Sequence, residues 1–224
     1  MNPAAPGRWG ALLFDLDGTL IDSMPLHERA WVRWFADMGR DDTADEAFFV
    51  ATAGRTAVEI VTDLFPGAPP AQVEAMADAR EALYRDLART ELQAIAGGLE
   101  LLRAARARGL KLAIGTAAPP ANIAVAFERF GLGALVDTVA SPADGLRGKP
   151  HPDIFAAAAQ RLGVAAPRCL VFEDAPLGLE AARRAGMPAI ALTTTLSADA
   201  FSAFPNRIAT VSDFTALDPA LLFD

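Results

Sequence analysis

Two aspartates directly after a short apolar run constrain the fold of this chain more than any other feature of its sequence. The run Ala11-Leu12-Leu13-Phe14 is typical of a fully buried β-strand, and Asp15 and Asp17 follow it at once. Charged side chains leave water only when they are paired or bind a metal ion. Because side chains alternate along a strand, both carboxylates are expected on one side, and Gly18 lets the chain turn away from them. In this arrangement one carboxylate can act as a nucleophile and the other as a general acid and base, while a divalent cation reduces the repulsion between them.

Two other interpretations of this segment have to be weighed. Asp and Gly are common turn residues, so the segment could do no more than close the strand. A calcium loop of the Asp-x-Asp-x-Asp-Gly type would place Leu13 at the first ligand position and Met24 at the twelfth, where a bidentate Glu is needed. The sequence therefore excludes the calcium loop. It favours a catalytic segment if partners for the two aspartates occur further along the chain.

The remaining sequence predicts an α/β fold interrupted by an all-helical block. After Ser23, a plausible helix N-cap followed by Pro25, helical patterns extend to Gly39 and then cover 44–53, 56–65 and 70–92 without a strand signal. From Gly97 onward, strands and helices alternate, which predicts a parallel sheet covered on both faces. The expected strands are 110–115, 135–140, 169–172, 189–192 and an edge element at 209–211. The expected helices are 99–108, 119–130, 152–162, 176–185 and 214–223.

Polar residues follow several of these expected strands. Ligands of open α/β sheets bind beyond the carboxyl ends of the strands, so these residues are expected to meet. The hydroxyl of Thr116 could bind a phosphate oxygen beside a helix N-terminus, could cap that helix, or could do both. Lys149 precedes Pro150, and Pro152 suits the first turn of the next helix, so a stiff loop presents the ammonium group.

The adjacent acids Glu173 and Asp174 end the next expected strand. The simpler interpretation is that they favour the N-terminus of the following helix. Opposite Asp15 and Asp17, however, two more carboxylates would repel each other unless a cation lay between them. Magnesium prefers hard oxygen ligands of this kind. We expect Asp174 to bind Mg²⁺ directly and Glu173 to bind it either directly or through water.

In order along the chain, these segments resemble the four motifs of the haloacid dehalogenase (HAD) superfamily. The matching segments are Asp15-Leu16-Asp17-Gly18-Thr19-Leu20-Ile21-Asp22-Ser23, Thr116, Lys149-Pro150-His151-Pro152-Asp153 and Glu173-Asp174-Ala175-Pro176-Leu177-Gly178. With its helical insert, the chain resembles the members of subfamily I, which include the phosphoglycolate phosphatase-like and β-phosphoglucomutase-like enzymes. The resemblance implies a Rossmann-like parallel-sheet core over residues 1–23 and 94–224 and an inserted helical cap domain over residues 24–93.

The resemblance also implies roles for individual residues. Asp15 would attack phosphorus and form an aspartyl-phosphate, while Asp17 would act as general acid and then as general base. Thr116 and Lys149 would stabilise the transferring group. Mg²⁺ would be bound by Asp15, Asp174, Glu173 and the backbone carbonyl of Asp17.

Further residues are expected to bind substrate. Ala117 and Asn122 follow Thr116 in the sequence. Gly54 and Arg55 precede a helix that begins with a capping box, and Arg55 would either contact the leaving group or lie in solvent. Arg80 on the long helix is a second cationic candidate.

His27 has two interpretations. It shares a helical face with Trp31 and Trp34, which is typical of a histidine that packs helices together. In mutase-like relatives, a histidine just after the first motif assists the acid and base chemistry. Both interpretations stay open at this point.

The predicted function is a Mg²⁺-dependent phosphatase for a small phosphomonoester, of the sugar phosphate or phosphoglycolate type. A phosphohexomutase would use the same core and stays an alternative. A dehalogenase needs neither the metal nor a general acid, so Asp17 and the pair Glu173-Asp174 argue against it. A non-catalytic binding protein would be expected to lose part of the acidic set, and none of it is lost.

Composition and charge restrict the classes of binding partner and the location that we expect for this chain. The formal net charge of −8 and the lack of a basic run argue against nucleic acid, and no apolar stretch reaches the length of a membrane span. Residues 1–10 lack the blocks of a signal peptide, so we expect a cytoplasmic protein, and we expect a monomer. The single cysteine, Cys169, lies in an apolar run and is expected in the core.

Overall fold

A six-stranded parallel sheet lies at the centre of the computed structural model, which describes residues 8–40 and 44–223. The strand order is β5-β4-β1-β6-β7-β8. The strands are β1 (Ala11–Phe14), β4 (Lys111–Gly115), β5 (Thr138–Ala140), β6 (Cys169–Glu173), β7 (Ala189–Leu192) and β8 (Arg207–Val211). β1 is fully buried, as predicted, and pairs with β4 and β6, so Phe14 lies beside Ile114 and Phe172. The carboxyl ends of these three strands therefore meet in the middle of the sheet.

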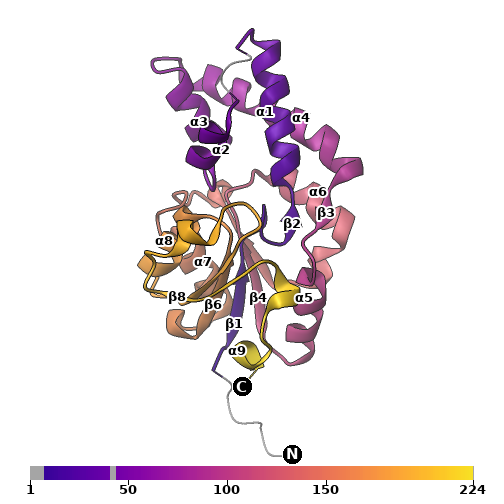
Figure 1. The fold of residues 1–224 in the computed structure, drawn as a ribbon, viewed down its shortest axis with the longest axis vertical. Coiled ribbons are helices and arrows are strands. Elements are labelled where there is room, and N and C mark those ends of the chain that lie inside the picture. The colour runs from indigo at the N-terminus through magenta and orange to yellow at the C-terminus, as the bar shows by residue number, and fades with distance from the viewer. Residues whose placement is uncertain (1–7, 41–43, 224) are drawn as a thin grey trace, which may run out of the picture.

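Helices cover both faces of the sheet (Figure 1). One face packs against α5 (Gly98–Ala107), α6 (Pro120–Phe130) and α9 (Ala220–Phe223), and the other packs against α7 (Asp153–Leu162) and α8 (Pro176–Arg184). Alternate residues of β1 contribute to the two apolar cores, because Leu12 and Phe14 belong to the first and Ala11 and Leu13 to the second. Cys169 is buried in the second core, as expected. The doubly covered parallel sheet confirms the predicted Rossmann-like core.

The predicted helical insert lies beyond the carboxyl ends of the strands (Figure 1). It consists of α1 (Met24–Asp37), α2 (Glu46–Thr52), α3 (Ala57–Leu64) and α4 (Pro70–Glu91). These helices have an apolar cluster of their own, which includes Trp31, Trp34 and Phe35. The capping box of Thr56 and Glu59 opens α3 as the sequence indicates. The insert confirms the predicted helical cap, while its limits at residues 24 and 93 stay a prediction.

A two-stranded antiparallel sheet joins the insert to the core and was not predicted. β2 (Ile21–Asp22) pairs with β3 (Gln93–Ala94) where the chain enters and leaves the insert. Strands of two residues are too short to produce an alternating sequence pattern. Ser23 occupies the N-cap position of α1, but its side chain makes no capping bond, and its Oγ has no hydrogen-bond partner among the described residues.

Two predicted elements are shorter in the structure. The strand expected from residue 135 begins only at Thr138, because the carboxylate of Asp137 accepts the Leu112 N–H at 2.8 Å. The helix expected over 214–223 is a 3₁₀ turn followed by α9, because Pro219 lacks the N–H that a continuous helix needs. The 3₁₀ helices are η1 (Leu132–Ala134), η2 (Pro142–Asp144), η3 (Ala166–Arg168), η4 (Ala198–Phe201) and η5 (Phe214–Ala216). No helix within the described ranges is both long and apolar enough to cross a membrane.

Candidate active site

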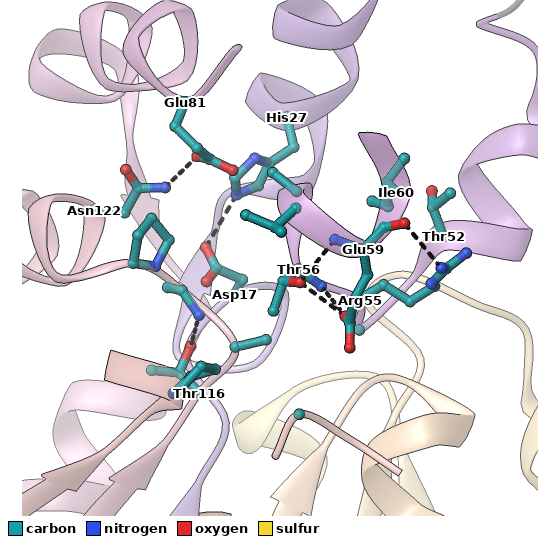
Figure 2. Close-up of a pocket in the computed structure, with 18 of the residues that line it drawn as sticks. Asp17, His27, Thr52, Arg55, Thr56, Glu59, Ile60, Glu81, Thr116 and Asn122 are labelled. Carbon is teal, nitrogen blue, oxygen red and sulfur yellow. Dashed lines mark hydrogen bonds and ion pairs between the residues drawn. The ribbon is translucent and has the colours of Figure 1, made fainter. Parts of the chain in front are cut away.

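A cavity of about 520 Å³ lies between the strand ends and the helices α1–α4 (Figure 2). Every residue that the sequence assigned to catalysis, substrate or metal lines it. We call the lining residues between 24 and 81 the cap wall. The core wall consists of the lining residues between 116 and 175 together with Asp15 and Asp17. The long-range prediction that these strand ends converge is therefore confirmed, whereas the role of each residue has to be judged from its contacts.

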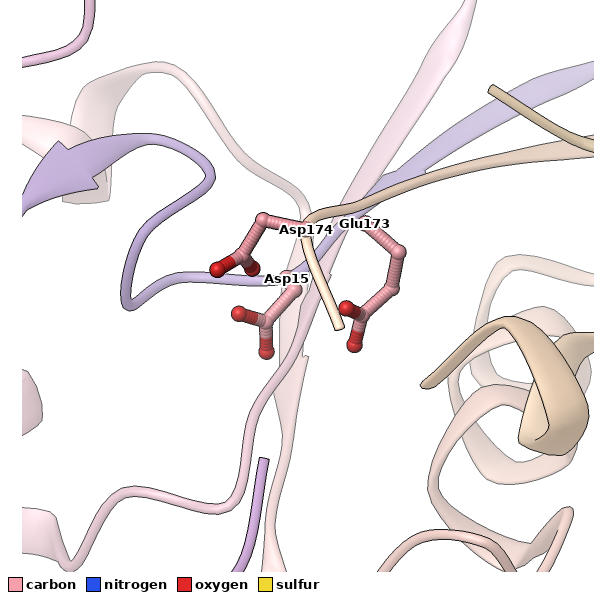
Figure 3. Close-up of side chains that lie close together, drawn as sticks. All are labelled: Asp15, Glu173 and Asp174. Carbon is pink, nitrogen blue, oxygen red and sulfur yellow. The ribbon is translucent and has the colours of Figure 1, made fainter. Parts of the chain in front are cut away.

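Three carboxylates of the core wall gather in one place (Figure 3). Asp15 directly follows β1, Glu173 ends β6, and Asp174 comes next. Each side chain has an oxygen within 4.8 Å of the corresponding oxygens of the other two, and all three side chains are buried. The adjacent parallel strands β1 and β6 end at the same level, which places these groups together. Such a concentration of negative charge requires cations nearby.

Lys149 supplies one positive charge. Its Nζ donates a hydrogen bond to Asp15 Oδ1 at 2.5 Å and another to Glu173 Oε1. The second oxygen of Glu173 accepts the backbone N–H of Ala175 at 2.8 Å. A Cβ atom at Gly178 would lie 1.7 Å from Glu173 Oε1, so the glycine in α8 leaves room for this carboxylate. Both oxygens of Glu173 are thus bound to protein donors, and this residue holds Lys149 in place.

Asp174 is held by two hydroxyl groups that sequence reasoning missed. Thr19 donates to Asp174 Oδ1 at 2.9 Å, and Thr195 donates to Oδ2. A Cβ at Gly18 would come within 2.1 Å of Oδ2, so this glycine is required for the close approach as well as for its φ of 75°. Thr195 follows β7 at the same edge of the sheet. The strand-end rule that identified Thr116 could therefore have identified Thr195.

The surroundings raise the pKa of two of these carboxyl groups. Burial is the largest cause of the raised pKa of Asp15. Lys149 lowers this pKa and the neighbouring carboxylates raise it further, so it lies well above its usual range. Burial and the charge of Glu173 raise the pKa of Asp174 to about 7, against the hydrogen bonds from Thr195 and Thr19. A single lysine therefore does not balance this group of carboxylates.

A divalent cation fits this group. The donors are hard carboxylate oxygens, which Mg²⁺ prefers, and they come from three residues close enough to share one ion. Glu173 is bound to an ammonium and a backbone N–H, whereas the two donors to Asp174 are hydroxyl groups, whose hydrogens can turn away from a bound cation. We therefore expect Asp15 and Asp174 to bind the ion directly.

Asp17 lies outside this group and contacts the cap wall instead. The Nε2 atom of His27 is 3.3 Å from Asp17 Oδ1 (Figure 2), and the His27 ring stacks on Tyr84 with centroids 3.8 Å apart. Desolvation raises the pKa of Asp17, but the hydrogen bond and charge of His27, together with smaller contributions that include the charge of Lys149, lower it below its usual value. His27 therefore both packs against a neighbouring helix and contacts the proposed acid, which joins the two interpretations of its sequence position.

The residues after β4 differ in what they contact. Thr116 is buried, and its Oγ1 accepts the Ala118 N–H at 3.0 Å, so the hydroxyl closes the turn before α6. Asn122 on α6 donates to Glu81 Oε2 at 2.5 Å and accepts from Arg85 at 3.1 Å. Asn122 thus connects the core to α4 of the insert.

The cationic residues of the cap wall are already paired. Arg55 donates to Asp63 Oδ2 at 2.6 Å. It also donates to the carbonyl of Glu59 at 3.3 Å (Figure 2). Arg80 is buried, and it donates to Glu81 at 2.9 Å and to the carbonyl of His27 at 3.0 Å. Its guanidinium also lies 4.4 Å from the centre of the Trp31 ring.

Gly54 marks where the insert touches the core. It has a φ of 81°, and a Cβ at this position would lie 3.3 Å from Ala175 Cβ. This residue therefore brings the loop before α3 against the loop after β6, on which Asp174 lies.

Comparison with known proteins identifies the family. The model of the haloacid dehalogenase-like hydrolases matches residues 9–186. The chain belongs to this family. Its members include validoxylamine A 7′-phosphate phosphatase of Streptomyces hygroscopicus subsp. limoneus, which is 34% identical over 193 residues, covering 85% of this chain and 88% of the relative. Fructose-1-phosphate phosphatase YqaB of Escherichia coli (strain K12) is 32% identical over 185 residues, covering 82% of this chain and 96% of the relative.

The structure of this hydrolase agrees with solved structures of the family. CbbY from Rhodobacter sphaeroides in complex with xylulose-(1,5)bisphosphate superposes with a TM-score of 0.81 at 25% identity, covering 93% of this chain and 96% of that chain. A much longer relative is similar over only a part of its length. The chloroplastic protein SUPPRESSOR OF QUENCHING 1 of Arabidopsis thaliana is 34% identical over 198 residues, which cover 85% of this chain and 18% of the relative.

Proposed function

We propose that this hydrolase is a Mg²⁺-dependent phosphatase that acts on a small phosphomonoester through an aspartyl-phosphate on Asp15. The observation that carries the proposal is the buried group of Asp15, Lys149, Glu173 and Asp174 that lines the cavity between the two walls. The relatives named validoxylamine A 7′-phosphate phosphatase and fructose-1-phosphate phosphatase support the same reaction.

In the first step, a carboxylate oxygen of Asp15 forms a bond to phosphorus while the bond from phosphorus to the ester oxygen breaks. The leaving alkoxide takes a proton from Asp17. In the second step, Asp17 takes a proton from a water molecule, whose oxygen attacks phosphorus and releases inorganic phosphate from Asp15. His27, 3.3 Å from Asp17, is positioned to exchange a proton with it.

The remaining residues of the core wall stabilise charge. Lys149 faces Asp15 and is positioned to bind an oxygen of the transferring phosphoryl group. Thr116 lies at the end of β4, where its hydroxyl and the N-terminus of α6 can bind another. Mg²⁺ bound by Asp15 and Asp174, with the carbonyl of Asp17, would neutralise the repulsion between the phosphate and the carboxylates.

The insert would exclude bulk water from the site. Gly54 contacts the loop after β6, and the cavity wall continues from α1 to α4. We propose that residues 24–93 act as this cap, because the lining residues between 24 and 81 form one wall of the cavity, and that the protein acts as a monomer.

A phosphohexomutase is the second candidate. The contact between His27 and Asp17 favours it, since acid and base chemistry at this position also serves return of the phosphoryl group to a sugar. The two reactions differ in product, because only the phosphatase releases inorganic phosphate in proportion to the substrate consumed.

Release of phosphate from p-nitrophenyl phosphate, measured with Mg²⁺ and with a chelator, tests the proposed function. We expect activity that requires Mg²⁺ and that the variant Asp15→Asn lacks. Asp199→Asn is the matched control, since Asp199 is exposed on the 3₁₀ helix after β7. Activity that persists in the chelator, or in Asp15→Asn, would contradict the proposal.

A further inference from the structure

We infer that the cap wall selects phosphomonoesters whose leaving group is uncharged or positively charged, and rejects those with a second acidic group. The inference rests on the proposed function, because it concerns which ester reaches Asp15. It is carried by the charges, the pairing and the apolar surface of the cap wall.

The cap wall has more acidic than basic side chains. Its carboxylates are Glu28, Glu59, Asp78 and Glu81, and its guanidinium groups are those of Arg55 and Arg80. The core wall adds no cation beyond Lys149 among the described residues, and Lys149 is bound to two carboxylates. A cleft lined by charges of one sign repels ligand groups of the same sign.

The two guanidinium groups are not free to balance an acidic leaving group. Arg55 is paired with Asp63 at 2.6 Å, and Arg80 is buried in its contacts with Glu81 and Trp31. Either residue can still donate a hydrogen bond to a hydroxyl group. Neither brings a net positive charge into the cavity, because each is matched by its own carboxylate.

Three carboxylates of the cap wall lack such a match, and one of them, Glu59, accepts hydrogen bonds from the backbone N–H and the hydroxyl of Thr56. Glu28 on α1 and Asp78 on α4 are exposed at the cavity, and no described residue forms an ion pair with either. They leave the cap wall with excess negative charge where the leaving group would lie. A carboxylate or a second phosphate there would approach these groups without a counter-charge.

The rest of the cap wall is largely apolar. Trp31, Phe49, Val58 and Ile60 line it, and Val58 is 44% exposed. Such a surface suits the carbon faces of a sugar or cyclitol ring, whose hydroxyl groups reach the few polar atoms nearby. We therefore infer a neutral or amino-substituted polyol as the leaving group. Phosphoglycolate, one of the two substrate types that the sequence suggested, would be disfavoured by its carboxylate.

Three monophosphates of six-carbon sugar derivatives of similar size test the inference, since they differ in charge away from the phosphate. These are glucosamine 6-phosphate with an amine, glucose 6-phosphate with neither group, and 6-phosphogluconate with a carboxylate. Each is measured as a competitor of p-nitrophenyl phosphate hydrolysis, so that even an ester that is turned over slowly gives an inhibition constant. We expect 6-phosphogluconate to compete at least about tenfold more weakly than the other two, which corresponds to ~1.4 kcal/mol.

Asp78→Lys should narrow this difference, because it replaces a negative charge of the cap wall with a positive one. Glu74→Lys is the matched control: it makes the same change of charge one helical turn earlier on α4, at an exposed position outside the cavity lining. We expect Glu74→Lys to leave the ratio of inhibition constants unchanged.

The possible results are distinct. If 6-phosphogluconate competes as well as glucose 6-phosphate, if none of the three competes, or if both lysine variants change the ratio equally, the inference about the leaving group is wrong. If p-nitrophenyl phosphate is itself not hydrolysed in Mg²⁺, the proposed function has failed instead.

Discussion

The two walls of the cavity are built in opposite ways. In the core wall, contacts join residues far apart in the sequence: Lys149 meets Asp15 across 134 positions, and Asp174 is held across 155 positions by Thr19, which lies outside the lining. In the cap wall, the charged pairs are local, since Arg55 pairs with Asp63 and Arg80 with Glu81. Contacts of the first kind exist only in the folded sheet, whereas local contacts can change without disturbing it. We infer that the core wall performs the reaction and that the cap wall selects the substrate.

The largest effect is expected in the core wall, from Lys149→Ala. Removing one group that stabilises the transferring charge costs on the order of a hundred- to a thousandfold in kcat. The loss should be the same for p-nitrophenyl phosphate and for a sugar phosphate, because both share the phosphoryl group. Lys111→Ala, at the exposed start of β4, is the control. A decrease of less than about tenfold would remove Lys149 from the proposed mechanism.

His27→Asn tests the residue that connects the two walls. A sugar alkoxide is a poor leaving group and needs a proton, whereas p-nitrophenolate leaves without one. We therefore expect kcat for a sugar phosphate to fall by about tenfold or more, with a much smaller change for p-nitrophenyl phosphate. Equal decreases for both esters would show that His27 acts through its packing on Tyr84.

Arg55→Ala should affect only the leaving group. Its pair with the exposed Asp63 contributes little to stability, so the fold should persist. Loss of one hydrogen bond to a hydroxyl group predicts a decrease in kcat/KM of at most about tenfold for a sugar phosphate. We expect no change for p-nitrophenyl phosphate. A loss shared by both esters would mean that Arg55 holds the insert in place.

Much of the core wall could be predicted from sequence, and little of the cap wall could. The rule that polar residues at the ends of parallel strands converge brought Asp15 and Asp174 together, and the proline-flanked loop and its resemblance to a family motif added Lys149. By contrast, whether Arg55 turns to Asp63 or to the cavity depends on how α3 packs, and no spacing encodes it. The short strands β2 and β3 were missed for a related reason, because their pairing depends on the position of the whole insert.

The smallest effect concerns stability and also separates the walls. The pKa of Asp174, about 7, is raised from its ordinary value of 3.8, so the metal-free folded protein binds this proton more tightly than the unfolded chain does. The contribution to stability is fully present below about pH 4 and is lost as the pH rises through about 7. Protons therefore compete with Mg²⁺ at this site. We expect Mg²⁺ to raise Tm by a few degrees more at about pH 8 than at about pH 5.5. If Asp78→Asn keeps this pH dependence of the Mg²⁺-induced increase in Tm and Asp174→Asn loses it, the effect belongs to the core wall. An increase in Tm that does not depend on pH would contradict this assignment.

The most direct test of the account is to trap the phosphoryl group on Asp15. The enzyme is mixed with Mg²⁺ and a rapidly cleaved phosphomonoester, quenched in acid within one turnover, digested and analysed by mass spectrometry. The account predicts that the peptide containing Asp15 gains the mass of one phosphoryl group, and that fragmentation places it on Asp15 and not on Asp17. Asp15→Asn should gain none. Phosphate release with no modified peptide at any quench time, or with the group on another residue, would contradict the central claim.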